Sequence, residues 1–212
     1  MASKKADPQF IYEELLKLFP EAHCELNFST VYQLAVAVML SAQTTDVSVN
    51  RVTGTLFEKY PDAEAMAQAE QKDVEEIIKS IGLYRNKAAN VISMSRKLQE
   101  EFSGVIPDDM DKLTSLPGIG RKSANMILSE GYKHPAIAVD THVHRVSARL
   151  GLAKETDTPD QTEMKLRRKF PEENWSKLHH LMIFFGRYKC HSRNPECDDC
   201  PFREYCRRKA SH

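Results

Sequence analysis

Five of the 212 residues are cysteines, and four of these lie together near the C-terminus. Cys190, Cys197, Cys200 and Cys206 fall within 17 residues, whereas Cys24 stands apart. In a reducing compartment, clustered cysteines favour metal binding over disulfides. Structural zinc sites usually pair two close ligand doublets across a longer gap, and only one doublet is present here. The spacing therefore favours a structural iron–sulfur cluster and leaves zinc as the alternative.

A second candidate is the segment from Leu113 to Ala124, which contains Pro-Gly-Ile-Gly-Arg-Lys. A short helix is predicted to end near Leu116, and a second to run to about Tyr132. Glycines in the turn leave backbone N–H groups uncovered. Together with the positive end of the second helix, these groups form a phosphate-binding site. Such a helix-hairpin-helix motif holds DNA by its backbone. The alternative is an ordinary connection between two helices.

Lys122 lies in the first turn of that second helix, beside Arg121. A helix N-terminus and a neighbouring cation both disfavour an ammonium, and a neutral amine is a nucleophile. Lys122 is therefore a candidate nucleophile. The alternative role is binding of a second phosphate.

Asp140 follows 18 residues after Lys122 and is predicted to cap a helix that runs through Leu150. The positive helix end would keep its carboxylate ionised. A carboxylate placed near a reacting sugar could stabilise the positive charge that develops there. Capping alone is the alternative, and the two roles are compatible.

The histidines are weaker candidates for a metal site than the cysteines. His179 and His180 are adjacent on a predicted helix and should point to different faces, and His142 and His144 are two residues apart. Neither pair suits one metal ion, so solvated or hydrogen-bonded rings are expected.

Almost the whole chain is predicted to be helical. Asp7 and Pro8 form a helix start, and Thr158-Pro159-Asp160-Gln161 forms a capping box. The near-continuous apolar run that begins after Ser29 or Thr30 indicates a helix buried on all sides. Residues 135–139 look like a short, buried, strand-like connector. Another helix is predicted to be capped by Asp46 and to end before Pro61, and further helices are predicted over 72–80, 86–102 and 176–188.

The net charge is zero, but its distribution is uneven. Residues 1–106 carry 11 basic and 15 acidic side chains, and residues 107–212 carry 19 and 15. The basic half could present a phosphate-binding face. No signal-peptide core and no apolar run long enough for a bilayer are visible, so an intracellular protein without membrane contact is expected.

With these residues in view, the sequence resembles the endonuclease III family of helix-hairpin-helix DNA glycosylases from about Glu21 to Cys206. The resemblance rests on the cysteine spacing and four further blocks, at 40–46, 81–84, 116–122 and 139–142. It implies that Lys122 is the nucleophile, that Asp140 assists it, and that the four cysteines hold a [4Fe–4S] cluster.

The implied fold is all-α, with two helical lobes flanking a cleft that contains the active site. Residues 22–133 would form a six-helix lobe with the hairpin. Residues 1–21 and 134–212 would form the lobe with the C-terminal cluster loop.

The implied activity is that of a bifunctional DNA glycosylase and abasic-site lyase that removes oxidised pyrimidines in base-excision repair. The partner would be double-stranded DNA with a damaged pyrimidine or an abasic site, bound by a monomer at the cytoplasmic nucleoid. Gln43 and Leu83 are predicted to fill the gap left by a flipped nucleotide. The other candidates for DNA contact are Gly118, Ile119, Gly120, Arg121, Arg145 and Arg193.

One departure from the family concerns the loop between the first two cysteines, which the family would be expected to make basic. Here it holds one arginine, Arg193, and one glutamate, Glu196, and Asp198 and Asp199 follow.

Two rivals remain. A related adenine-mismatch glycosylase would have no catalytic lysine, and a non-catalytic iron–sulfur DNA-binding protein would need neither Lys122 nor Asp140.

Overall fold

The computed structural model describes residues 5–208 and contains helices but no strand over that range, which confirms the all-α prediction. The chain divides into two compact units. Residues Glu25–His134 form one, named here the hairpin unit. The described parts of Met1–Cys24 and Pro135–His212 form the other, named here the cluster unit.

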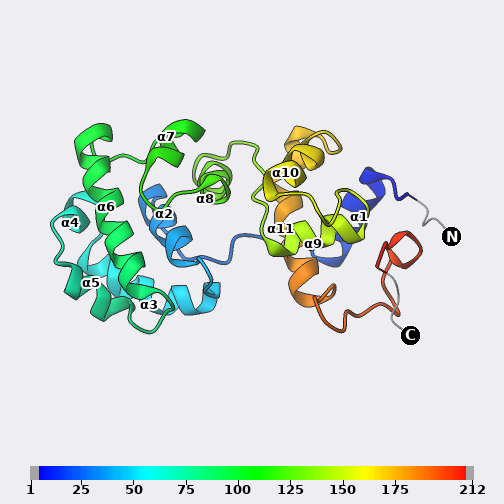
Figure 1. Cartoon of the computed structure of the whole chain (residues 1–212), viewed down its shortest axis with the longest axis horizontal. Coiled ribbons are helices and arrows are strands. Elements are labelled where there is room, and N and C mark those ends of the chain that lie inside the picture. Colours follow the sequence, from blue (N-terminus) through cyan, green and yellow to red (C-terminus); the bar gives the residue numbers. More distant parts are fainter. Residues whose placement is uncertain (1–4, 209–212) are drawn as a thin grey trace. The chain divides into compact units, whose positions relative to one another are not determined.

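The hairpin unit is built around a helix that is buried along almost its whole length. This helix, α2, packs against α3, α6, α8 and η1 (Figure 1). Nearly every side chain of α2 is buried, as its continuous apolar sequence predicts. The helices of the unit are α2 (Val31–Leu40), α3 (Asp46–Lys59), α4 (Ala63–Ala67), α5 (Gln71–Ile78), α6 (Tyr84–Phe102), α7 (Met110–Ser115), α8 (Arg121–Met126) and the π-helical η1 (Ile127–Gly131).

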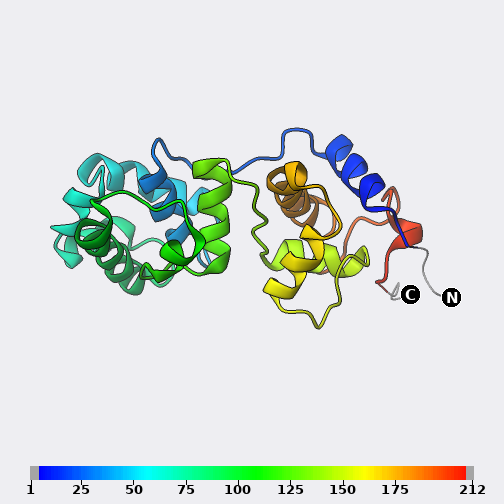
Figure 2. The same cartoon turned by 90° about the horizontal axis from the view of Figure 1, so that it is seen from above.

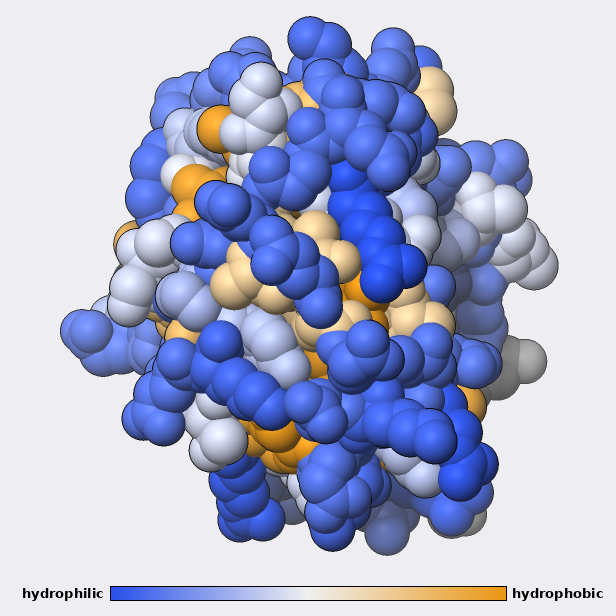
Figure 3. All heavy atoms as spheres, turned by 90° about the vertical axis from the view of Figure 1, so that its left-hand side faces the viewer, coloured by the Kyte–Doolittle hydropathy of each residue, from blue (hydrophilic) through white to orange (hydrophobic). Residues whose placement is uncertain are grey.

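Side-chain caps mark the starts of α2 and α3. Thr30 caps α2 by accepting from the Gln33 N–H. The prediction that Asp46 caps α3 is wrong by one residue, because the cap is Thr45, whose hydroxyl accepts from the Ser48 N–H at 3.3 Å. Hydrophilic side chains cover most of the end of the unit that carries α4, α5 and α6, with apolar atoms visible only in gaps between them (Figure 3).

The cluster unit joins the two ends of the described chain. Figures 1 and 2 show α1 beside the C-terminal turn, where Phe10 meets Phe202 and Tyr205 at ring-centroid distances of 6.2 and 5.6 Å. The core also includes Phe185 of α11. Helix α11 packs against both α1 and α9. The elements are α1 (Pro8–Leu18), α9 (Thr141–Arg149), α10 (Pro159–Arg167), η2 (Glu172–Asn174), α11 (Trp175–Tyr188) and η3 (Arg203–Tyr205).

Two sequence predictions hold in this unit. Thr158 and Gln161 form the predicted capping box at the start of α10. Ala136, Ile137, Ala138 and Val139 are buried, as predicted, although they form no strand.

The two glycines of the hairpin turn have different backbone roles. Gly118 has a φ of +79°, and a Cβ there would lie 2.6 Å from Met39 Cε and 3.2 Å from Asn90 Cβ. Gly120 is the N-cap of α8 with a φ of −95°, and a Cβ there would meet nothing within 4 Å. Only Gly118 is therefore required by the fold of the turn.

We expect Gly118→Ala to lower the free energy of unfolding by more than about 1 kcal/mol, because alanine pays a steric cost at positive φ and meets Asn90. Gly120→Ala is the matched control and should change stability by less than about 1 kcal/mol. Urea titration of both variants measures the difference. Equal losses would show that the turn depends on both glycines.

Candidate nucleic-acid interface and active site

The hairpin places an uncapped helix start at the surface. Helix α7 ends at Ser115, and α8 begins at Arg121 after Gly120, which has no side chain to cap it. The first N–H groups of a helix have no partner inside it, and a helix start of this kind can bind an anion. Arg121 and Lys122 are exposed in that first turn.

Ile119, by contrast, packs the turn. Its side chain is buried, and its N–H donates to the Leu116 carbonyl at 3.1 Å. Its place between two glycines gave no signal of burial in the sequence. The two glycines on either side of it are exposed.

Asp140 caps α9, as predicted. Its Oδ1 accepts from the backbone N–H groups of His142 and Val143, each at 2.8 Å. Its Oδ2 lies 2.9 Å from Nδ1 of His142, which donates to the carboxylate in the matching tautomer. The three contacts fix the orientation of the carboxylate. His142 is a site neighbour that sequence reasoning left without a role, although a histidine two residues after a capping aspartate is a usable signal.

Gln43 and Leu83 share an unusual backbone conformation. Their φ values are 54° and 59°, in the left-handed region, and both side chains are exposed. Left-handed backbone costs a non-glycine residue roughly 1–2 kcal/mol and persists only where the surroundings enforce it. Leu83 is 56% exposed, so packing of its side chain does not explain the conformation.

Lys87 connects the turns that carry these two residues. Its ammonium donates to Thr44 Oγ1 at 2.7 Å, and its backbone N–H donates to the Leu83 carbonyl at 3.0 Å. The side chain is only 5% exposed, and burial lowers the pKa of its amine. One buried lysine thus ties the turn next to Gln43 to the helix start at Leu83. Sequence reasoning missed this link, because Lys87 and Thr44 are 43 residues apart.

Two other predicted DNA contacts lie in the cluster unit. Arg145 donates to the carbonyls of Gly186 at 2.8 Å and Cys190 at 3.2 Å, so much of its guanidinium joins α9 to α11 and the cluster loop. Arg193 is exposed in the loop between the first two cysteines.

The four clustered cysteines surround one hollow. Cys190, Cys197, Cys200 and Cys206 line a single small cavity together with Phe185 and Phe202, and none of them forms a disulfide. Burial raises the pKa of the Cys200 thiol, and the other three thiols raise it further, as expected of four sulfurs brought close together. Four thiols around one apolar hollow fit a metal centre.

Arg149 supports this centre from α9. Its Nη1 donates to Cys190 Sγ at 3.1 Å and to the His191 carbonyl at 2.7 Å, and its Nη2 donates to the Ser192 carbonyl at 3.1 Å. A guanidinium beside a thiolate offsets part of the negative charge of the centre. Arg149 was absent from the sequence-based set of site residues.

The acidic residues of the cluster loop pair with its cations. Asp199 accepts from Lys189 at 2.6 Å, and Asp198 lies 3.5 Å from Arg203. The hydrogen bond from Lys189 lowers the pKa of Asp199, and the same bond raises the pKa of Lys189. These pairs reduce the positive charge that the loop offers.

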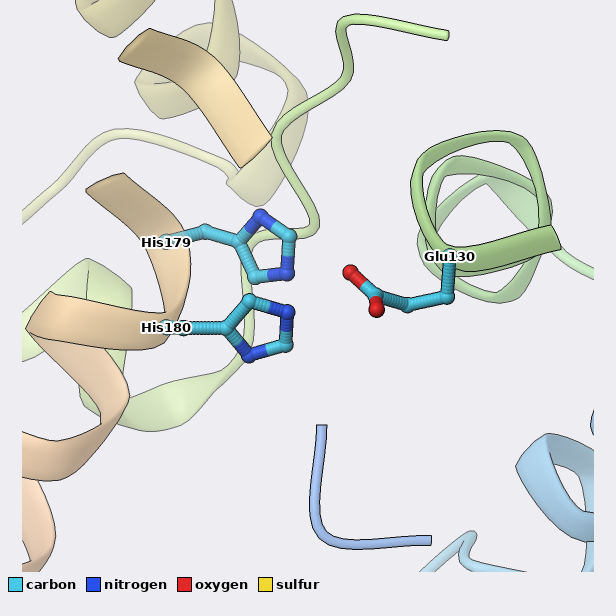
Figure 4. A group of neighbouring side chains, drawn as sticks. All are labelled: Glu130, His179 and His180. Atoms are coloured by element: carbon cyan, nitrogen blue, oxygen red, sulfur yellow. The ribbon is translucent and has the colours of Figure 1, made fainter. Parts of the chain in front are cut away.

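The prediction that His179 and His180 point to different faces is wrong. Figure 4 shows the two rings side by side on α11, with centroids 4.0 Å apart. Both residues are buried, so neither is solvated. Consecutive residues of α11 from Leu178 to Met182 are all buried, so two adjacent side chains can share one buried environment here. His144 behaves as predicted, with hydrogen bonds to Thr162 Oγ1 and the Glu155 carbonyl.

Comparison with known families agrees with this geometry. Residues 36–172 match the HhH-GPD superfamily base excision DNA repair protein family. Residues 190–206, which span the four cysteines, match the iron–sulfur binding domain of endonuclease III. Among the described residues, no helix is both long enough and apolar enough to cross a membrane.

Relatives cover nearly the whole chain. Endonuclease III of Bacillus subtilis is 48% identical over 94% of this chain and 91% of its own length, and that of Escherichia coli K12 is 42% identical over 90% of each. The structure of a trapped endonuclease III–DNA covalent intermediate superimposes with a TM-score of 0.91 at 46% identity, covering 94% of this chain and 93% of that one. A thermostable thymine-DNA glycosylase shares the fold, with a TM-score of 0.85 at 19% identity and 94% coverage of each chain. The chain therefore belongs to the endonuclease III family of the HhH-GPD superfamily, the base-excision DNA glycosylases and abasic-site lyases whose four cysteines hold a [4Fe–4S] cluster.

Proposed function

We propose that Lys122 and Asp140 carry out base removal and strand cleavage, on duplex DNA that contains an oxidised pyrimidine or an abasic site. The observation that carries this assignment is the exposure of Lys122 in the first turn of α8, directly after the uncapped hairpin. An amine at this position lies next to the groups that would hold the DNA backbone. We also propose that the enzyme works as a monomer at the nucleoid.

The hairpin would hold the DNA backbone through uncovered N–H groups near Gly118 and Gly120, with Arg121 adding charge. Arg145 and Arg193 would add phosphate contacts from the cluster unit. None of these groups reads sequence, because phosphate contacts position a duplex without distinguishing its bases. Selectivity would come from extrusion of the damaged nucleotide, which costs a few kcal/mol and less for a damaged base.

The reaction would begin when the neutral Lys122 amine attacks C1′ of the extruded nucleotide. The C1′–N bond breaks, and the base leaves with the electron pair and then takes a proton. Ring opening gives a Schiff base between C1′ and Nζ. Loss of a proton from C2′ then breaks the C3′–O bond by β-elimination, and the 3′ phosphate leaves.

Asp140 would stabilise the positive charge that develops at the sugar as the base departs. Its carboxylate is held by three donors, so it needs no reorganisation during the reaction. The capping bonds and the electrostatic role use the same ionised group.

Gln43 and Leu83 would fill the space left by the extruded nucleotide. Their enforced left-handed backbones display both side chains to solvent instead of packing them. Side chains inserted into a base stack offset part of the cost of distortion. The Lys87 link between the turns would keep the two residues at a fixed separation.

Replacing Lys122 with Gln should abolish both strand cleavage and covalent trapping by borohydride on abasic-site DNA, because the amide is not a nucleophile. Fold and DNA affinity should remain. Lys72→Gln, in the first turn of α5, is the matched control and should keep full activity. A pure Lys122→Gln protein that still traps would sink the assignment. Trapping by the wild-type chain also separates it from both rival functions.

Asp140→Asn should slow turnover by roughly 10²–10⁴-fold, the usual effect of a lost charge-stabilising or acid–base group. Asparagine still caps a helix, so stability should fall by less than about 1 kcal/mol. Asp109→Asn, at the N-cap of α7, provides the control: the same change in capping with no change in turnover. An unchanged rate, or an unfolded Asp140→Asn protein, contradicts the double role.

Leu83→Ala should slow base removal from duplex DNA more than strand cleavage at an existing abasic site, where less unstacking is needed. The melting temperature should barely change, because the side chain is exposed. Val105→Ala removes a comparably exposed side chain from the same unit and should alter neither rate. Equal losses on both substrates would place Leu83 outside the DNA stack.

Purified protein should be yellow-brown and contain about four irons per chain, as a single [4Fe–4S] cluster requires. Cys206→Ser should lose iron, whereas Cys24→Ser, outside the cluster loop, should retain it. Elemental analysis and visible absorbance measure both. Zinc in place of iron in anaerobically purified wild-type protein would refute this assignment.

A further inference from the structure

The positive charge of the C-terminal half gathers around two hollows in the cluster unit. Arg145, Arg149, Arg207 and Arg208 line the first hollow, next to the last turn of α9. Glu155 is the acidic residue among the described residues that line it. A chain with zero net charge thus concentrates four guanidinium groups at one place.

The second hollow shares Arg207 with the first. Its other basic residues are Lys154, from the loop after α9, and Lys165, Arg168 and Lys169, from the end of α10 and just beyond it. The described lining of this hollow contains no carboxylate. Together the two hollows form one surface, named here the α9–α10 basic surface.

Some of these cations already have partners in the structure. Arg145 and Arg149 donate to carbonyl groups, and Lys165 is paired with Asp157 at 2.6 Å. The side chains of Lys154, Arg168, Lys169 and Arg207 are exposed. The surface therefore combines half-buried cations that have partners with cations that are exposed.

Arg207 lines both hollows, and contacts with α9 and the turn after it fix its position. Its N–H donates to the Arg149 carbonyl at 2.7 Å, which fixes the segment after Cys206 against the end of α9. Its guanidinium lies over Gly151, where a Cβ would be 2.6 Å from Arg207 Nε. Gly151 has a φ of +74°, so glycine serves both the turn and the seat of the arginine.

Close packing of like charges raises the energy of the free protein, and a bound polyanion lowers it. The cluster loop cannot supply the same charge, because Asp199 and Asp198 pair with its cations. We propose that the α9–α10 basic surface binds the phosphate backbone of duplex DNA, as a contact beyond those proposed above for the hairpin, Arg145 and Arg193. The proposal rests on DNA being the partner of this enzyme, but not on the roles given to Lys122 and Asp140.

The test is the salt dependence of binding to undamaged duplex DNA. Each lysine or arginine that contacts a phosphate contributes about 1 to the slope of log affinity against log salt. Replacing Arg168 and Lys169 together with Gln should therefore weaken binding and reduce the slope by roughly 2. Both side chains are exposed, and their replacement leaves the fold intact, which melting temperature checks.

Two further variants make the result specific. Lys72→Gln combined with Lys79→Gln removes the same net charge from exposed positions on and after α5 and should leave the slope unchanged. Arg168→Lys combined with Lys169→Arg keeps the charges and should keep the wild-type slope. A slope that is unchanged by the Arg168 and Lys169 substitutions, or lowered equally by the α5 pair, overturns the proposal.

Borohydride trapping of the same variants separates this proposal from the assignment of the catalytic residues. With saturating abasic-site DNA, the Arg168→Gln, Lys169→Gln protein should form the covalent complex at the wild-type rate, because neither side chain has a part in the reaction. A reduced slope of log affinity against log salt, with intact trapping, supports DNA binding by the α9–α10 basic surface. An unchanged slope with intact trapping rejects DNA binding by this surface and leaves the assignment of Lys122 in place.

Discussion

The unpaired N–H groups at the start of an α-helix are the constraint on which the site depends. Each helix leaves these donors without an internal partner, and water, a side chain or a ligand must accept from them. Helix α8 begins after a glycine, which offers no side-chain cap, whereas α9 begins after Asp140, whose carboxylate accepts from two of these N–H groups. One helix start is thus suited to an anion from outside, and the other holds an anion of the protein itself.

Two turns of the hairpin unit depend on a left-handed backbone conformation at a non-glycine residue. Gln43 and Leu83 have a conformation that is unfavourable for residues with a side chain. Lys87 links the two segments, because its ammonium donates to Thr44 and its backbone N–H donates to Leu83. Burial of a lysine is costly unless its ammonium is hydrogen-bonded, and Thr44 supplies that bond. The fold thereby keeps a strained backbone at two positions whose side chains are exposed, as is common at functional sites.

In the cluster unit, the cysteine loop and the basic surface are parts of one arrangement. Arg149 donates to Cys190 Sγ and to the three consecutive carbonyls that begin at Cys190, and its own carbonyl accepts from the Arg207 N–H. The loop therefore does more than surround a cluster. Arg149 contacts the loop and also holds the chain that follows Cys206, so the same residue helps to place Arg207, which lines both hollows.

The sequence by itself determined the local features. The apolar run of α2, the capping box at Thr158, the Asp140 cap, the hairpin and the cysteine spacing are written in neighbouring residues, so each could be predicted without a fold. The short helix α4 and the cap at Thr45 were missed, because a single turn carries little periodicity and adjacent polar residues compete as caps. Only the tertiary structure decided the burial of His179 and His180, the Lys87–Thr44 bond and the gathering of cations around Arg207. These features join residues far apart in the chain, and their energies depend on burial and distance, which a linear sequence does not contain.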